Sequence, residues 1–170
     1  AAGRFIWRND SLNAIPIIGD EYNTISQGWT RINESNIGAG GIGGNSISAL
    51  DMSIADGNTL YYGTENGQLF KLEDVNGTNP IRTTIDGANF PNGYISSIAV
   101  DPNDADIALI TFSNYNIPSI FSTTDGGQTW TDVSGNLEEN PDGSGNGPSL
   151  TWVEMITIDG ITTYYAGTTI

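Results

Sequence analysis

The sequence contains no cysteine and no histidine, and only five of its 170 residues are lysine or arginine. Without cysteine the chain has no disulfide framework, thiolate metal site or cysteine nucleophile. Without histidine it has no imidazole metal ligand and no Ser-His-Asp triad. Its 20 acidic residues bring the formal net charge to −15. Because phosphate binding needs clustered Lys and Arg, this balance argues against a nucleic-acid partner.

Long apolar runs are absent as well. No window approaches the roughly 18 to 20 apolar residues of a transmembrane helix, so we expect no membrane span. Charged residues make up only 15% of the chain, while 4 Trp, 7 Tyr and 5 Phe are present. With Gly, Asn, Ser and Thr as the main polar residues, this composition predicts short strands joined by tight turns. An acidic chain almost without lysine favours a secreted or cell-surface location.

Three segments share apolar residues at their first, fourth and sixth positions. They are Ile47–Ser53, Ile95–Asp101 and Val153–Asp159, and their starts lie 48 and 58 residues apart. Each is followed by a second apolar segment, at 59–64, 107–112 and 162–167. Third and fourth segments complete two of the units, at 68–72 and 81–85 and at 119–123 and 129–133. Asn-Gly and Asp-Gly pairs between the segments predict hairpins.

Four short strands in a repeated unit of about 50 residues predict an all-β fold, a partial β-propeller of four-stranded antiparallel blades. A β-sandwich is the alternative. The phase of the repeat divides the chain into a half blade (1–36), two blades (46–87 and 94–136) and a second half blade (150–170). Since propellers have about 4 to 8 blades, we expect a fragment of one larger propeller. The remaining blades of the same longer chain are then its first partner.

Two linkers return from an outer strand to the next inner strand, one Gly-rich (36–45) and one polar (138–148). In a propeller such connections lie near the central axis, where ligands usually bind. The glycines of the first linker have no lysine among them and no helix signal after them, so they do not predict a phosphate-binding loop.

One local motif is sharper than the repeats. Thr123, Asp125, Gly127, Thr129 and Trp130 follow the pattern Ser/Thr-x-Asp-x-Gly-x-Thr-Trp. The Asp125 carboxylate can accept hydrogen bonds from backbone N–H groups of its own turn, and Gly127 supplies the backbone freedom that the turn needs. Trp130 then packs beneath the turn. The motif resembles the Asp-box, or BNR repeat. The resemblance implies a structural, non-catalytic hairpin between the third and fourth strands of a blade.

A degenerate copy of this motif lies near the start of the chain, with Asp10 and Trp29 separated by an insertion. In the middle unit Asp74 is kept and the tryptophan is lost. The stretch from Val100 to Asn136 most resembles the secreted BNR-repeat proteins of Bacteroidetes, and it is similar to sortilin-like and xyloglucanase-like proteins. The resemblance implies export by the type 9 secretion system.

Two functions compete. The first is a binding, adhesion or assembly module that contacts glycans or a surface protein, and this is the preferred reading. The alternative is a glycoside hydrolase with its active site at the propeller axis, similar to an endoglucanase or xyloglucanase. A sialidase ranks lower because no arginine lies on an expected inner strand. A hydrolase needs two carboxyls about 5 to 10 Å apart. Asp51 and Glu154 depart from the repeat and are the candidate catalytic residues.

No cofactor is expected, with calcium as the one alternative. Asp101, Asp104 and Asp106 place three carboxylates within six residues, and calcium takes such ligands. Their spacing does not match an EF-hand, and a solvated turn is the preferred interpretation.

Three aromatic residues, Trp7, Tyr115 and Trp152, have rings that can stack on sugars. We predict that they are core aromatics instead.

Overall fold

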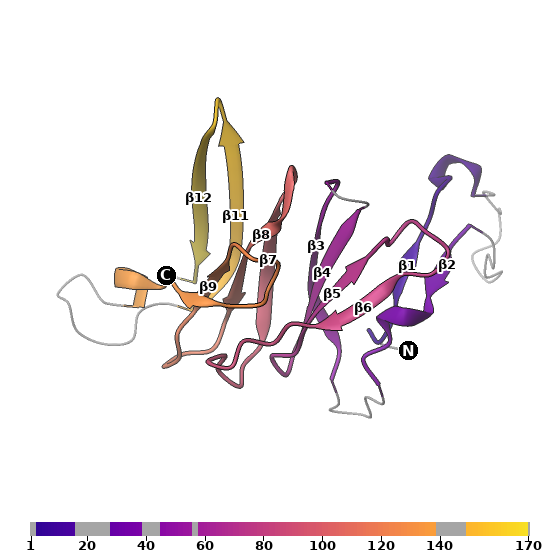
Figure 1. Cartoon of the computed structure of the whole chain (residues 1–170). Coiled ribbons are helices and arrows are strands. Elements are labelled where there is room, and N and C mark those ends of the chain that lie inside the picture. Colours follow the sequence, from indigo (N-terminus) through magenta and orange to yellow (C-terminus); the bar gives the residue numbers. More distant parts are fainter. Residues whose placement is uncertain (1–2, 16–27, 39–44, 56–57, 139–148, 170) are drawn as a thin grey trace.

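The computed structural model describes residues 3–15, 28–38, 45–55, 58–138 and 149–169, and these residues form an all-β structure (Figure 1). The strands are β1 (Ile6–Arg8), β2 (Thr30–Ile32), β3 (Ile47–Ser53), β4 (Thr59–Thr64), β5 (Leu69–Glu73), β6 (Ile81–Thr84), β7 (Ile95–Asp101), β8 (Asp104–Phe112), β9 (Ile120–Thr123), β10 (Thr131–Asp132), β11 (Leu150–Ile158) and β12 (Ile161–Thr168). Within the described ranges the helical pieces are three short 3-10 turns, Leu12–Ala14, Asn33–Ser35 and Gly135–Glu138. Every strand predicted from the sequence is therefore confirmed, with shifts only at the ends.

The strands form four antiparallel sheets, each built from neighbours in the sequence. Sheet I is β1–β2, sheet II is β3–β4–β5–β6, sheet III is β7–β8–β9–β10 and sheet IV is β11–β12. Gly-containing turns join β4 to β5, β5 to β6, β9 to β10 and β11 to β12, as the Asn-Gly and Asp-Gly pairs predict, whereas the connections β7–β8 and β8–β9 contain no glycine. Sheets II and III thus have the same order of four strands.

The four sheets stand in a row, with the N-terminus at one end and the C-terminus at the other (Figure 1). A separate apolar core fills each gap: Ile6 and Leu72 lie in the core between sheets I and II. Tyr61 and Phe121 lie between sheets II and III, and Leu109 belongs to the core between sheets III and IV. The row of sheets differs from the two-layer sandwich that the sequence left as an alternative.

Burial on both faces explains the composition of the middle strands. All six residues of β4 are buried, because sheet II has a neighbour on each side. The sequence of such a strand is a nearly continuous apolar run, without the alternation of apolar and polar residues that one exposed face would give. We call the side of each sheet that faces the next sheet along the chain its forward face, and the opposite side its backward face.

The first strands of sheets II, III and IV share one register. Each pairs its first residue, Ile47, Ile95 or Leu150, and then has a bulge before its third residue. The starts of the units therefore lie 48 and 55 residues apart, and the predicted start at Val153 is wrong by three residues. Leu150, Val153 and Met155 match the first, fourth and sixth apolar positions as well as the predicted set does, so the apolar pattern alone cannot choose between the two registers.

The corrected register changes which residues are equivalent. Asp51 pairs with Tyr61, and Glu154 pairs with Tyr165. Ala99 holds the same position in sheet III. Asp51 and Glu154, which were predicted to depart from the repeat, therefore share one position of it, and sheet III has Ala99 at that position.

Candidate functional site

A polar groove of about 360 Å³ crosses the first strands of sheets II, III and IV. We call it the inner groove. It is lined by Ser48, Ala49, Leu50, Asp51, Ser96, Ser97, Ile98, Trp152 and Glu154. The strands β3, β7 and β11 lie beside one another here because the sheets pack through their first strands. The structure thus brings both candidate catalytic residues, Asp51 and Glu154, to one groove.

Two serine hydroxyls in the groove tie neighbouring sheets together. Ser48 Oγ donates to the carbonyl of Ile95 at 2.6 Å, and Ser96 Oγ donates to the carbonyl of Leu150 at 3.0 Å. Both serines follow the first residue of their strand, and both acceptors are the first residue of the next sheet. This link was not predicted from the sequence, although the Ile-Ser pair that begins both units is a signal for it.

Asp51, like the two serines, links its sheet to the next one. Its Oδ2 accepts the backbone N–H of Val100 on β7 at 2.7 Å. A first strand has an open edge whose N–H groups need acceptors. The Asp51 carboxylate therefore caps the next sheet, and one of its oxygens is already engaged before any ligand binds.

Glu154 is less constrained than Asp51. Its Oε1 accepts the N–H of its own neighbour, Met155, at 3.2 Å. It lies on the forward face of sheet IV, which no other described sheet covers. Its carboxylate is therefore the more available of the two groups for a ligand in the inner groove.

Trp152 adds an exposed aromatic ring to the groove. The equivalent ladder positions hold the small residues Ala49 and Ser97. The prediction that Trp7, Tyr115 and Trp152 are core aromatics is wrong, because all three side chains are exposed. Trp7 and Trp152 belong to the two end sheets, and Tyr115 lies in the loop between β8 and β9, so each lacks the flanking sheet that would bury it.

A second structural site is the turn from Thr123 to Trp130, between β9 and β10. Asp125 Oδ1 accepts the N–H of Thr129 at 2.9 Å, and Oδ2 accepts the Thr129 hydroxyl at 2.6 Å. Thr123 Oγ1 donates to Asp125 Oδ1 at 2.7 Å and accepts the N–H of Gly127 at 3.0 Å. Gly126 and Gly127 have φ values of 70° and 86°, which favour glycine. Hydrogen bonds among the residues of the turn therefore stabilise its conformation.

The hydrogen bonds of this turn lower the pKa of Asp125. The hydroxyl and N–H of Thr129 and the hydroxyl of Thr123 stabilise its ionised form and lower its pKa to about 2. Trp130 is buried beneath the turn, and its Nε1 donates to the carbonyl of Ile85 on the neighbouring sheet at 2.9 Å. The carboxylate is thus fully used in holding the turn, while the indole fixes the turn to sheet II.

The related residues near the N-terminus are arranged differently. Asp10 forms an ion pair with Arg8 at 3.0 Å, and Trp29 is exposed on sheet I. The insertion between them, 16–27, lies outside the described residues, as do most of the two linkers, 39–44 and 139–148. The interpretation of Asp10 and Trp29 as a degenerate copy of the turn stays a prediction.

Two of the three calcium candidates, Asp101 and Asp104, accept hydrogen bonds within the hairpin between β7 and β8. Asp101 Oδ1 accepts the N–H of Asn103 at 2.8 Å, and Asp104 Oδ1 accepts the N–H of Asp106 at 3.0 Å. Among the described residues no group of three or more acidic side chains is arranged to hold a metal ion. Carboxylates that accept local N–H groups are typical of turns.

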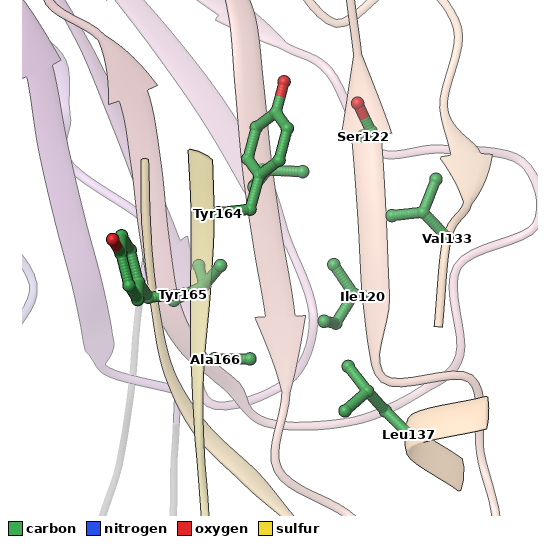
Figure 2. Close-up of a pocket in the computed structure, with 9 residues that line it drawn as sticks. Ile120, Ser122, Val133, Leu137, Tyr164, Tyr165 and Ala166 are labelled. Atoms are coloured by element: carbon green, nitrogen blue, oxygen red, sulfur yellow. The ribbon is translucent and has the colours of Figure 1, made fainter. Parts of the chain in front are cut away.

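A second groove, of about 370 Å³, is apolar and lies between the outer strands of sheet III and β12. Its lining includes Ile120, Val133, Leu137 and Tyr164. Figure 2 shows Tyr164 on the side of β12 that faces Ile120, while Tyr165 points to the opposite side. We call this space the outer groove.

No helix among the described residues has the length and apolar character needed to cross a bilayer. No known family model matches the chain, and no curated protein matches it significantly.

Proposed function

We propose that the chain is an arc of an Asp-box β-propeller and acts as an extracellular or cell-surface module for binding or assembly, with glycans as its ligands at the inner groove. The row of antiparallel sheets supports the architecture, because each sheet packs on the next through its first strand. The repeated bulge and the repeated serine links support it as well. A ring of such sheets needs further sheets beyond those described here.

The observation that carries the glycan assignment is Trp152 beside Glu154 in the inner groove. A sugar presents an apolar face, which an exposed indole ring covers, and a rim of hydroxyls, which donate to a carboxylate. In this chain a tryptophan stands where the other sheets have Ala49 and Ser97. The groove therefore combines the two chemistries that sugar recognition needs.

A binding role fits the groove better than hydrolysis. Glycoside hydrolysis uses two carboxyls, one of which must exchange a proton or attack the sugar. Asp51 is engaged with the Val100 N–H at 2.7 Å and holds sheet III in place. Glu154 is then the one groove carboxylate that is free of a contact with another sheet.

Titration calorimetry of the purified chain with xyloglucan oligosaccharides, cello-oligosaccharides and sialyllactose tests this proposal. We expect heat of binding with at least one of them and its loss in Trp152→Ala. Leu12→Ala, which removes an exposed apolar side chain from the N-terminal 3-10 turn, is the matched control. Release of reducing ends that disappears in Glu154→Gln would favour the hydrolase instead. Absence of both binding and turnover would overturn the glycan assignment.

A further inference from the structure

Four Asn-Gly pairs are present in the chain, at 66–67, 76–77, 92–93 and 146–147, and the last lies outside the described residues. Such a pair is chemically unstable when the nitrogen of the glycine can attack the side-chain amide of the asparagine. Glycine favours this attack because it has no Cβ in the path. The three described asparagines are all exposed, so access to water does not distinguish them. The hydrogen bonding of the glycine N–H does distinguish them.

The first two pairs form tight turns in which the glycine N–H is occupied. Gly67 N donates to the carbonyl of Thr64 at 3.1 Å, and Gly77 N donates to the carbonyl of Asp74 at 2.8 Å. An attack by either nitrogen must first break that hydrogen bond, which stabilises the turn. Both turns therefore protect the asparagine that precedes the glycine.

The third pair lies in the connection from β6 to β7, between sheets II and III. Gly93 is buried, yet within the described residues its N–H has no hydrogen-bond acceptor. The next amide is held, because Tyr94 N donates to Asn114 Oδ1 at 2.6 Å. Buried backbone N–H groups without a partner are rare in proteins. The nitrogen of Gly93 is therefore free of a competing hydrogen bond, directly after the exposed Asn92.

The packing around Gly93 requires a glycine at this position. A Cβ added to it would lie 2.8 Å from Asn114 Oδ1 and 2.9 Å from Ile117 Cδ1. The carbonyl of Gly93 in turn lies against the turn between β4 and β5, where a Cβ added to Gly67 would be 3.0 Å from it. The fold therefore demands, directly after Asn92, the residue that least hinders attack on the asparagine.

From these observations we infer that Asn92 is a site of spontaneous deamidation in the folded protein. Gly93 N forms a bond to Asn92 Cγ, the Cγ–Nδ2 bond breaks, and the proton of Gly93 N passes through solvent to the leaving ammonia. Water then opens the resulting succinimide at either carbonyl, which gives aspartate or isoaspartate. Water is the only other reactant. The inference goes beyond the proposed function, because it concerns the connection between sheets II and III and needs no ligand.

The isoaspartate product alters the junction of the two sheets. It adds one carbon atom to the main chain just before β7, which begins at Ile95, a residue that is 0% exposed. The carbonyl of Ile95 also accepts the hydroxyl of Ser48 on sheet II at 2.6 Å. A longer main chain cannot keep both the close packing of Gly93 and the register of Ile95. The reaction therefore weakens the contact between sheets II and III as the protein ages.

Peptide mapping of the purified chain after ageing at mildly alkaline pH tests the inference. Digestion with trypsin and chymotrypsin together places the three pairs in separate peptides, 63–70, 72–82 and 83–94. Each converted peptide gains the mass difference between an amide and an acid. We expect Asn92 to convert about three- to tenfold faster than Asn66 or Asn76, the factor that one backbone hydrogen bond supplies. In urea, where the fold is lost, all three should convert at similar rates.

Two matched variants connect the reaction with stability. Asn92→Gln lengthens an exposed side chain by one carbon and so disfavours the five-membered ring, and Asn66→Gln makes the same change at a protected turn. After ageing, the urea midpoint of the native chain and of Asn66→Gln should fall, while that of Asn92→Gln should stay constant. Asn92→Asp introduces the charge without the longer main chain, so before ageing it should have the native midpoint.

The two experiments together decide the inference. Conversion of Asn66 or Asn76 as fast as that of Asn92 in the folded chain would overturn it, as would an unreacted Asn92 under conditions that convert all three in urea. Equal midpoints for the aged native chain and aged Asn92→Gln would overturn the effect on the sheet junction. These results are independent of glycan binding, which is tested by its loss in Trp152→Ala.

Discussion

Trp130 and Trp29 each stand three residues before a residue that faces the preceding strand, Val133 opposite Ile120 and Ile32 opposite Ile6, but they lie at different places in the row of sheets. Trp130 is in the middle, where it packs on sheet II and donates to Ile85. Trp29 is at the end, where no described sheet lies behind it, and its indole is exposed. The neighbouring sheet, and not the position in the strand pair, therefore buries the ring. Substitutions in the middle of the row should therefore have larger effects than comparable substitutions elsewhere.

The largest contrast is expected between the two tryptophans themselves. Trp130→Ala should lower the free energy of unfolding by about 3 to 5 kcal/mol, because it leaves a cavity in the core between sheets II and III. Trp29→Ala should change it by less than about 0.5 kcal/mol, because its ring is exposed. Urea unfolding followed by circular dichroism measures both. Equal losses would mean that the hairpin, and not the neighbouring sheet, determines the contribution of the ring.

A smaller contrast separates two glycines with positive φ. A Cβ added to Gly127, at φ 86°, would lie 2.8 Å from Ile85 Cδ1, whereas one added to Gly135, at φ 54°, meets nothing within 4 Å. Both Gly→Ala variants carry the backbone strain, and only Gly127→Ala also pushes two sheets apart. We expect Gly127→Ala to be about 1 to 3 kcal/mol less stable than Gly135→Ala in the same urea assay. Indistinguishable midpoints would show that sheets II and III are not closely packed at this turn.

The third contrast compares the two carboxylates of the inner groove. Asp51→Ala leaves the Val100 N–H without its acceptor and should cost about 1 to 2 kcal/mol. Glu154→Ala removes no link to another sheet and should be close to neutral. Hydrogen exchange at the Val100 amide should quicken in Asp51→Ala alone. Unchanged exchange there would refute the capping role of Asp51.

The smallest contrast concerns acid stability. The pKa of Asp125 is lowered to about 2 from an ordinary value of 3.8, so its carboxylate stabilises the folded chain above about pH 4. That contribution is lost as the pH falls through this interval toward 2. The melting temperature of the native chain should therefore drop more steeply below pH 4 than that of Asp125→Ala. Asp10→Ala, which removes an exposed ion pair, should keep the native slope, and differential scanning calorimetry at stepped pH compares all three.

Local sequence signals were sufficient to predict the positions of the strands and the conformation of one turn. Alternating and continuous apolar runs bounded by Asn-Gly and Asp-Gly pairs placed the ends of the strands of sheets II and III to within three residues. Thr123, Asp125, Gly127 and Thr129 interact within a span of seven residues, so their pattern could be interpreted without knowledge of the rest of the chain.

The candidate site depended on information that the sequence does not carry locally. The start of β11 was placed three residues late because its apolar residues satisfy the repeat in two registers, and only pairing with β12 selects Leu150. The equivalence of Asp51 with Glu154 followed from that selection. The serine links also join residues 47 and 54 positions apart, so no local pattern reveals the acceptors.

The sequence by itself therefore determined that this protein is made of short antiparallel strands in four-strand units, because hydrophobic alternation and turn chemistry act over a few residues. Only the tertiary structure decided which faces of those units are covered. A side chain such as Tyr61 or Tyr165 has the same neighbours along its strand in both sheets, and the difference lies in whether another sheet excludes water from its far side.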